Sequence, residues 1–108
     1  MAFDAYDRSL QLLRCIAPLI DQLATRDPDL VKQLRRAAAS VTLNISEANR
    51  RVGKDRPHLF RIALGSAAEV AACLEVAVAL GYLEAASVAP ALELIDRVRA
   101  MTYRLANR

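Results

Sequence analysis

Two pairs of polar residues in the middle of the chain have the spacing that a functional site on helices needs. Asn44 precedes Glu47 by three positions, and Ser66 precedes Glu69 by three positions. Residues three apart lie on nearly the same side of a helix. If the two segments are adjacent helices, the four side chains form either a buried polar network that fixes helix register or a carboxylate site.

A carboxylate site with two metal ions needs more inward-facing acids and histidines, usually with Glu-x-x-His spacing, and that spacing is absent here. The sole histidine, His58, lies among basic residues with no second ligand nearby. The sequence also has no phosphate-binding glycine loop and no nucleophile elbow. We therefore predict a structural polar network of Asn44, Glu47, Ser66 and Glu69, no metal or cofactor, and no enzymatic activity. A carboxylate enzyme remains an alternative.

Basic residues are concentrated in one part of the chain. Between residues 26 and 61 there are nine Lys and Arg against four Asp and Glu, whereas the rest has a net charge of −2. The segment "NRRVGKDR" brings Arg50, Arg51, Lys54 and Arg56 together, which suits contact with nucleic-acid phosphates. The alternative is a solvated end that Glu47 and Asp55 partly neutralise. Only Phe60 is aromatic there, so base stacking is not indicated.

Hydrophobic periodicity and the helix boundary signals define the elements that would position these residues. Asp27 and Pro28 mark one helix start, Gly53 a stop, and Asp55 with Pro57 the next start. Pro18 predicts a kink but no break. The predicted helices cover residues 4–23, 28–51, 55–81, and 84 or 88 to 107. Short connections between four helices predict an all-α, antiparallel up-down-up-down four-helix bundle, with residues 1–108 as a single domain.

The third predicted helix has apolar residues on nearly every side. Between Ile62 and Leu80 the only polar side chains are Ser66, Glu69 and Glu75. A helix that is apolar all round is normally buried, and three partner helices cannot cover all of it. We therefore predict a homo-oligomer. The alternative is a stable monomer, because exposed alanines cost little.

The cellular location follows from charge and cysteine placement. Acids near the N-terminus do not fit a secretory signal, and Glu69 and Glu75 oppose membrane insertion of the apolar helix. Cys15 and Cys73 lie far apart among apolar neighbours, as buried thiols do in a reducing compartment. We expect a cytoplasmic protein with no membrane contact.

The segments "LRRAAASVTLNISEA", "FRIALGSAAEV" and "ALGYL" resemble the bacterial four-helix-bundle proteins encoded in intervening sequences of the 23S rRNA gene. The chain is also similar to the accessory variability proteins of diversity-generating retroelements. Ala48 stands where the family motif Asn-Ile-Ala-Glu-Gly has its glycine. The resemblance implies a homopentamer of four-helix protomers and, from the retroelement relatives, a basic surface that binds nucleic acid and a reverse transcriptase. The residues that match that surface are Arg35, Arg36, Arg50, Arg51, Lys54 and Arg56.

Together these inferences predict a non-enzymatic, nucleic-acid-associated accessory protein. Its expected partners are other copies of itself, RNA or DNA, and a reverse transcriptase. The alternative function is a protein–protein adaptor with a structural role and no nucleic-acid binding.

Overall fold

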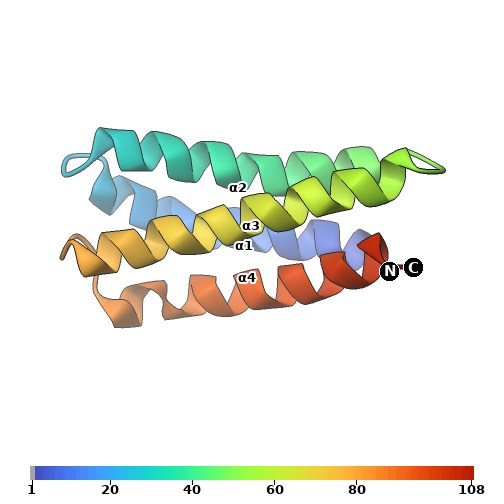
Figure 1. Cartoon of the computed structure of the whole chain (residues 1–108). Coiled ribbons are helices and arrows are strands. Elements are labelled where there is room, and N and C mark those ends of the chain that lie inside the picture. Colours follow the sequence, from blue (N-terminus) through green and yellow to red (C-terminus); the bar gives the residue numbers. More distant parts are fainter. Residues whose placement is uncertain (1) are drawn as a thin grey trace.

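The computed structural model describes residues 2–108, with side chains from Asp4 onward, and these residues form four helices (Figure 1). Each helix runs antiparallel to the one before it, and α4 closes the bundle by packing against α1. The described chain measures 43 × 22 × 19 Å, and both termini lie at the same end of the bundle. The helices are α1 (Ala2–Leu23), α2 (Pro28–Asn49), α3 (Asp55–Ala79) and α4 (Ala85–Ala106). The predicted up-down-up-down bundle is confirmed.

The start of α2 is formed as the sequence predicts. The Asp27 carboxylate accepts a hydrogen bond of 3.0 Å from the backbone N–H of Leu30, and Pro28 occupies the first turn. That bond satisfies one of the amide groups that a helix start leaves unpaired. The cap therefore defines where α2 begins.

The end of α3 is closed by a glycine in the left-handed region. Gly81 has φ of +79°, and its N–H donates to the Val78 carbonyl at 3.0 Å. The N–H of Tyr82 donates to the Ala77 carbonyl at 2.8 Å, which completes a Schellman motif. This pattern reverses the chain within a few residues, so α4 returns directly along α3.

The helix boundaries differ from the sequence prediction by a residue or two. Helix α2 ends at Asn49, two residues before Arg51, and α3 ends at Ala79, two residues before Gly81. Asp55 lies in the first turn of α3 and makes no capping hydrogen bond, because Lys54 occupies the cap position. Helix α1 continues unbroken through Pro18. None of these differences changes which side of a helix faces the core.

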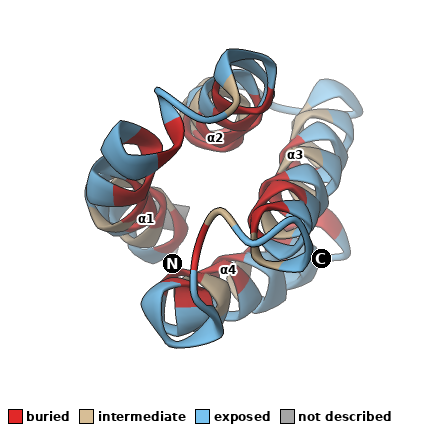
Figure 2. Cartoon of the chain, turned by 90° about the vertical axis from the view of Figure 1, so that its left-hand side faces the viewer, coloured by how far each residue is buried: buried red, intermediate tan, exposed pale blue. Residues whose placement is uncertain are grey.

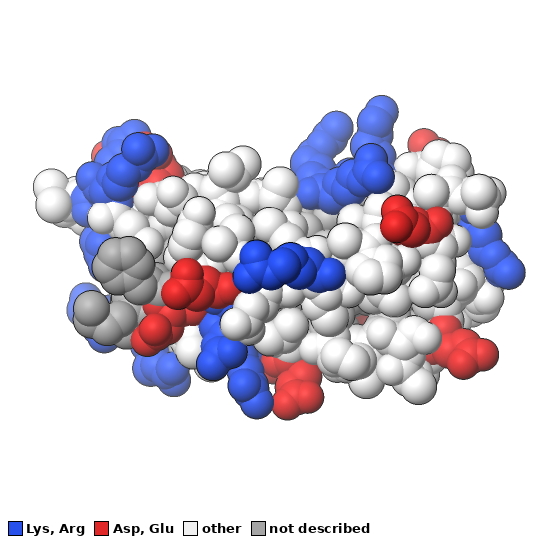
Figure 3. All heavy atoms as spheres, turned by 180° about the vertical axis from the view of Figure 1, so that it is seen from behind, with Lys and Arg blue, Asp and Glu red and all other residues white. Residues whose placement is uncertain are grey.

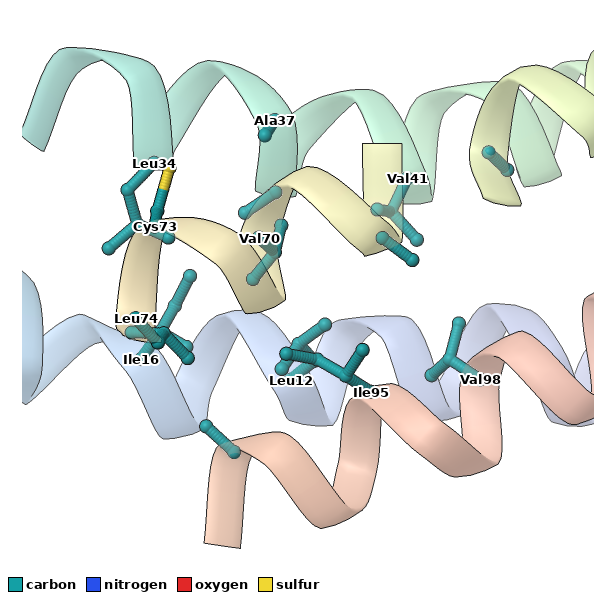
Figure 4. Packing of buried hydrophobic residues seen from close by; sticks show 14 of the residues in the cluster. Leu12, Ile16, Leu34, Ala37, Val41, Val70, Cys73, Leu74, Ile95 and Val98 are labelled. Carbon is teal, nitrogen blue, oxygen red and sulfur yellow. The ribbon is translucent and has the colours of Figure 1, made fainter. Parts of the chain in front are cut away.

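The core is made by the inward faces of all four helices (Figure 2). Figure 4 shows Leu34 and Val41 of α2 and Val70 and Leu74 of α3 pointing into the space between the helices. These residues are fully buried. Removing a Leu, Ile or Val side chain from water contributes about 1.5–3 kcal/mol of stability. This shared core therefore holds each helix in a fixed rotational position.

Helix α3 has a second apolar face that the chain leaves uncovered. Val76 is 43% exposed and Leu80, directly after the helix, is 58% exposed, although Val70 and Leu74 on the inner face are completely buried. By length and composition alone α3 is able to cross a membrane. Its inner face is accounted for by the bundle core. Its outer face requires a separate explanation.

Two neighbouring positions on α2 test the rotational position of that helix. Ile45 is fully buried, whereas Leu43 is 66% exposed. Ile45→Ala should lower the free energy of unfolding by about 2–5 kcal/mol because it leaves a cavity. Leu43→Ala should change it by about 0.5 kcal/mol or less. Urea denaturation followed by circular dichroism measures both, and equal losses would contradict this orientation of α2.

Candidate nucleic-acid interface

A polar contact joins α2 and α3 halfway along the bundle. The hydroxyl oxygens of Ser40 and Ser66 lie 2.7 Å apart. The side-chain amide of Asn44 donates to the Ser40 hydroxyl at 3.0 Å and to the Ser40 carbonyl at 2.8 Å. Ser40, and not Asn44 itself, makes the contact with α3. Asn44 orients Ser40, a residue that the three-residue spacing of the predicted network does not include.

The two glutamates of the predicted network lie away from this contact. Glu47, in the last turn of α2, forms ion pairs with Arg51 at 2.8 Å and with Arg50 at 3.2 Å, both just beyond the end of that helix. Glu69 is exposed in a shallow groove between α2 and α3 that is also lined by Asp29 and Val76. Asn44 and Ser66 are thus connected through Ser40, whereas Glu47 and Glu69 do not join them. Across residues 2–108 there is no group of three or more His, Cys, Asp and Glu side chains placed to hold a metal ion.

Electrostatics at Glu47 and Cys73 follow from their neighbours. Hydrogen bonds from Arg51, and then from Arg50, hold the pKa of Glu47 below its ordinary value. Burial raises the pKa of the Cys73 thiol, and the charge of Glu69 raises it further. Cys73 therefore stays protonated and unreactive at neutral pH. Glu47 stays ionised, and it offsets part of the positive charge beside it.

The connection between α2 and α3 is less positive than its sequence suggests. Arg51 contacts Asp55 at 3.3 Å in addition to Glu47. Arg56 donates to the Ala48 carbonyl at 3.2 Å, and its guanidinium lies 5.1 Å from the centre of the Phe60 ring. Arg56 is therefore used to hold the end of α2 against α3. Of the four basic residues expected here, Lys54 has no partner in the described chain, and Arg50 has only Glu47.

The first half of α2 carries a patch of positive charge without acidic partners. Arg35 and Arg36 are exposed and make no ion pair or hydrogen bond with the described residues. Lys32, one helical turn before Arg36, is equally exposed and unpaired. We call Lys32, Arg35 and Arg36 the α2 cation patch. Ala24, Pro28 and Val31 border it in a shallow groove. The spacing of Lys32 and Arg36 was the signal that could have identified Lys32.

The predicted basic surface consists of two separate groups. Figure 3 shows them along the upper edge of the molecule, where α2 lies: one right of centre, and one at the left-hand end beside acidic residues. Arg50 directly follows the last residue of α2 and is fourteen residues after Arg36, which corresponds to about 21 Å at the helical rise. The six predicted residues therefore divide into Arg35 with Arg36 and a second group at the α2–α3 connection.

Comparison with known proteins identifies the family. The sequence profile of the 23S rRNA-intervening sequence proteins matches residues 1–104. The chain belongs to this family. Its fold is similar to the crystal structure of a protein of unknown function from the S23 ribosomal protein family of Bacteroides thetaiotaomicron, with a TM-score of 0.85 and 21% identity. That similarity covers 96% of this chain and 99% of the other. No curated protein matches the chain.

The family assignment confirms the resemblance to 23S rRNA-intervening sequence proteins, and the structural similarity confirms the four-helix fold. Neither comparison assigns an activity, because the similar structure belongs to a protein of unknown function. The features of this member of the intervening-sequence family that bear on function are the distribution of its charge and its exposed apolar surface.

The ion pairs of Glu47 predict a pH-dependent contribution to stability. Because its pKa is lowered in the folded chain, these pairs stabilise the fold above the ordinary carboxyl value of 4.5. Their contribution is lost as pH falls through the lowered pKa. Glu47→Gln should therefore slightly destabilise the protein at pH 7 and have no effect in strong acid. Urea midpoints of both proteins across this pH range measure the effect, and a difference that persists in acid would contradict it.

Proposed function

We propose that this protein is a non-enzymatic, nucleic-acid-associated accessory protein of the cytoplasm that works as a homo-oligomer. Its basic α2 side contacts the phosphates of RNA or DNA. The observation that carries this proposal is the α2 cation patch, in which three adjacent cations lack any acidic partner in the described chain. Cations in this state are free to displace the counterions of a phosphate backbone, which gives affinity independent of sequence.

The outer face of α3 supports self-association. It combines exposed Val76 and Leu80 with small residues, and Gly65 lies among them. A Cβ atom added at Gly65 would meet nothing within 4 Å, so packing within the chain does not require a glycine there. A glycine inside a helix costs about 1 kcal/mol relative to alanine. Close approach of another copy's backbone accounts for that cost. The resemblance of the chain to its family implies an assembly of five copies.

Self-association also strengthens the proposed phosphate contact. Each copy added to a closed, symmetric assembly repeats the α2 cation patch. Several weak contacts on one nucleic acid then act together, because the second binding event takes place at a high effective concentration. The oligomer and the nucleic-acid contact are therefore two parts of one proposed mechanism.

The second candidate function is a protein–protein adaptor without nucleic-acid binding. The α2–α3 connection favours it, because Glu47 and Asp55 partly neutralise the arginines there. Val52 in the same connection is 88% exposed, and an exposed apolar side chain beside mixed charges suits a protein surface. By the resemblance to retroelement accessory proteins, a reverse transcriptase is the kind of partner this surface would meet.

Charge reversal in the α2 cation patch separates the two candidates. Arg35→Glu/Arg36→Glu should weaken binding to labelled structured RNA and duplex DNA by at least about tenfold at low salt, because phosphate contacts are replaced by repulsion. Arg99→Glu/Arg104→Glu on α4 reverses two other exposed cations and is the matched control, with little expected loss. Fluorescence anisotropy measures both.

Two results would count against nucleic-acid binding. The first is that the wild-type protein fails to bind either probe at low salt. The second is that the α2 variant binds as tightly as the α4 control. Either result would leave the adaptor as the better candidate.

Substitution of Gly65 tests the proposed interface on α3. Gly65→Leu points into open space in the isolated chain, so the bundle should still form. The added side chain should hold a second copy away and shift the sedimentation coefficient at micromolar concentration toward that of one copy. Ala100→Leu, on an exposed position of α4, is the control and should leave the assembly unchanged. A wild-type protein that sediments as a single copy would refute the proposal.

A further inference from the structure

The outward side of α2 carries a line of residues that recur at helical spacing. Lys32, Arg36, Leu43 and Arg50 are separated by four, seven and seven positions, which returns each to nearly the same direction around the helix axis. All four are exposed. Lys32 and Arg36 of the α2 cation patch and Arg50, directly after the last residue of α2, therefore lie on one side of that helix.

The distance between the two cation groups is set by the fold. Leu34, Val41 and Ile45 hold the inner side of α2 in the core. The contact of Arg56 with the Ala48 carbonyl, at 3.2 Å, ties the connection to the end of α2. Lys54 belongs to the same connection, four residues after Arg50. At 1.5 Å per residue, the positions of Arg36 and Arg50 are therefore about 21 Å apart along the axis of α2.

The surface between the two groups has no feature that binds unpaired bases. Ala39 and Leu43 separate the cations, and Leu43 is the large exposed residue there. Tyr103, the exposed large aromatic residue of the described chain, belongs to α4, which packs against α1 and α3. Phe60 is buried. Proteins that bind single strands gain affinity by stacking bases on exposed aromatic side chains, and α2 offers none.

We propose that α2 binds double-stranded nucleic acid, with its two cation groups on the two phosphate backbones that border one groove. This inference rests on the proposed function and names the class of ligand for the same surface. The grooves of a B-form duplex are about 6–12 Å wide, so long side chains from positions about 21 Å apart along the helix reach the two backbones from their outer sides. The uncharged stretch at Leu43 faces the groove between them.

A duplex suits this surface better than a single strand because its phosphates are already ordered. A rigid helix with fixed cations binds without further loss of freedom when its ligand is also rigid. A single strand has to be ordered along α2, and no stacking compensates for that loss. Contacts only with backbone phosphates also make binding insensitive to base sequence.

Binding of the wild-type protein to matched probes tests the ligand class. The probes are an RNA duplex and a DNA duplex of about 20 base pairs and the unpaired strand of each, followed by fluorescence anisotropy at several KCl concentrations. At least one duplex should bind about tenfold more tightly than its own single strand. The RNA and DNA arms show which duplex is preferred.

Two double substitutions test whether both cation groups touch the duplex. Lys32→Gln/Arg36→Gln removes the first group and Arg50→Gln/Lys54→Gln removes the second. Each should reduce the slope of log Kd against log salt by about 1.8, since each lost phosphate contact contributes about 0.9. Arg99→Gln/Arg104→Gln on α4 is the control and should not change the slope. Circular dichroism and sedimentation show that each variant keeps its fold and assembly.

The outcomes separate this inference from the proposed function. Equal affinity for single strands and duplexes, or a slope that only one of the two variants reduces, overturns the duplex proposal and leaves phosphate binding in place. Failure of the wild-type protein to bind any probe at low salt overturns both.

Discussion

The packing of α2 against α3 is the constraint on which the rest of this structure depends. It is the most extensive contact between two helices in the described chain. Small residues of both helices, such as Ala37 and Ala67, are buried, and the Ser40–Ser66 hydrogen bond connects the two helices directly. Small side chains let helices approach closely, and a hydrogen bond between them selects one register. Because the rotational positions of α2 and α3 are set by this packing, the directions in which their solvent-facing residues project are set as well.

This packing has opposite consequences for the two helices. On α2 it directs Leu34 and Ile45 inward, which leaves the α2 cation patch in solvent. On α3 it covers one apolar row and exposes the other, because three partner helices cannot surround a fourth. The proposed phosphate contact and the proposed self-association are therefore both consequences of how one chain packs. Neither needs a catalytic group or a metal ion.

Much of this arrangement was predictable from the sequence, because hydrophobic periodicity reports the inward side of each helix directly. The cap at Asp27 and the uncovered face of α3 follow from residue type and spacing alone. The hydrogen-bond and contact partners of individual side chains were not predictable from the sequence. Asn44 bonds to Ser40 of its own helix, and Arg56 binds the Ala48 carbonyl and covers Phe60. Which partner a polar side chain contacts depends on its rotamer and on distances of a few tenths of an ångström. Charge counting could not separate Arg56 from its exposed neighbours.

Native-state hydrogen exchange of α2 tests the central claim, that core packing holds this helix rigid over its whole length. Amides near Leu34, Val41 and Ile45 should exchange only through global unfolding, with the same opening free energy as the slowest amides of α3. Faster exchange in α2 through local opening, while α3 remains protected, would contradict the account. The two groups of cations would then have no fixed separation.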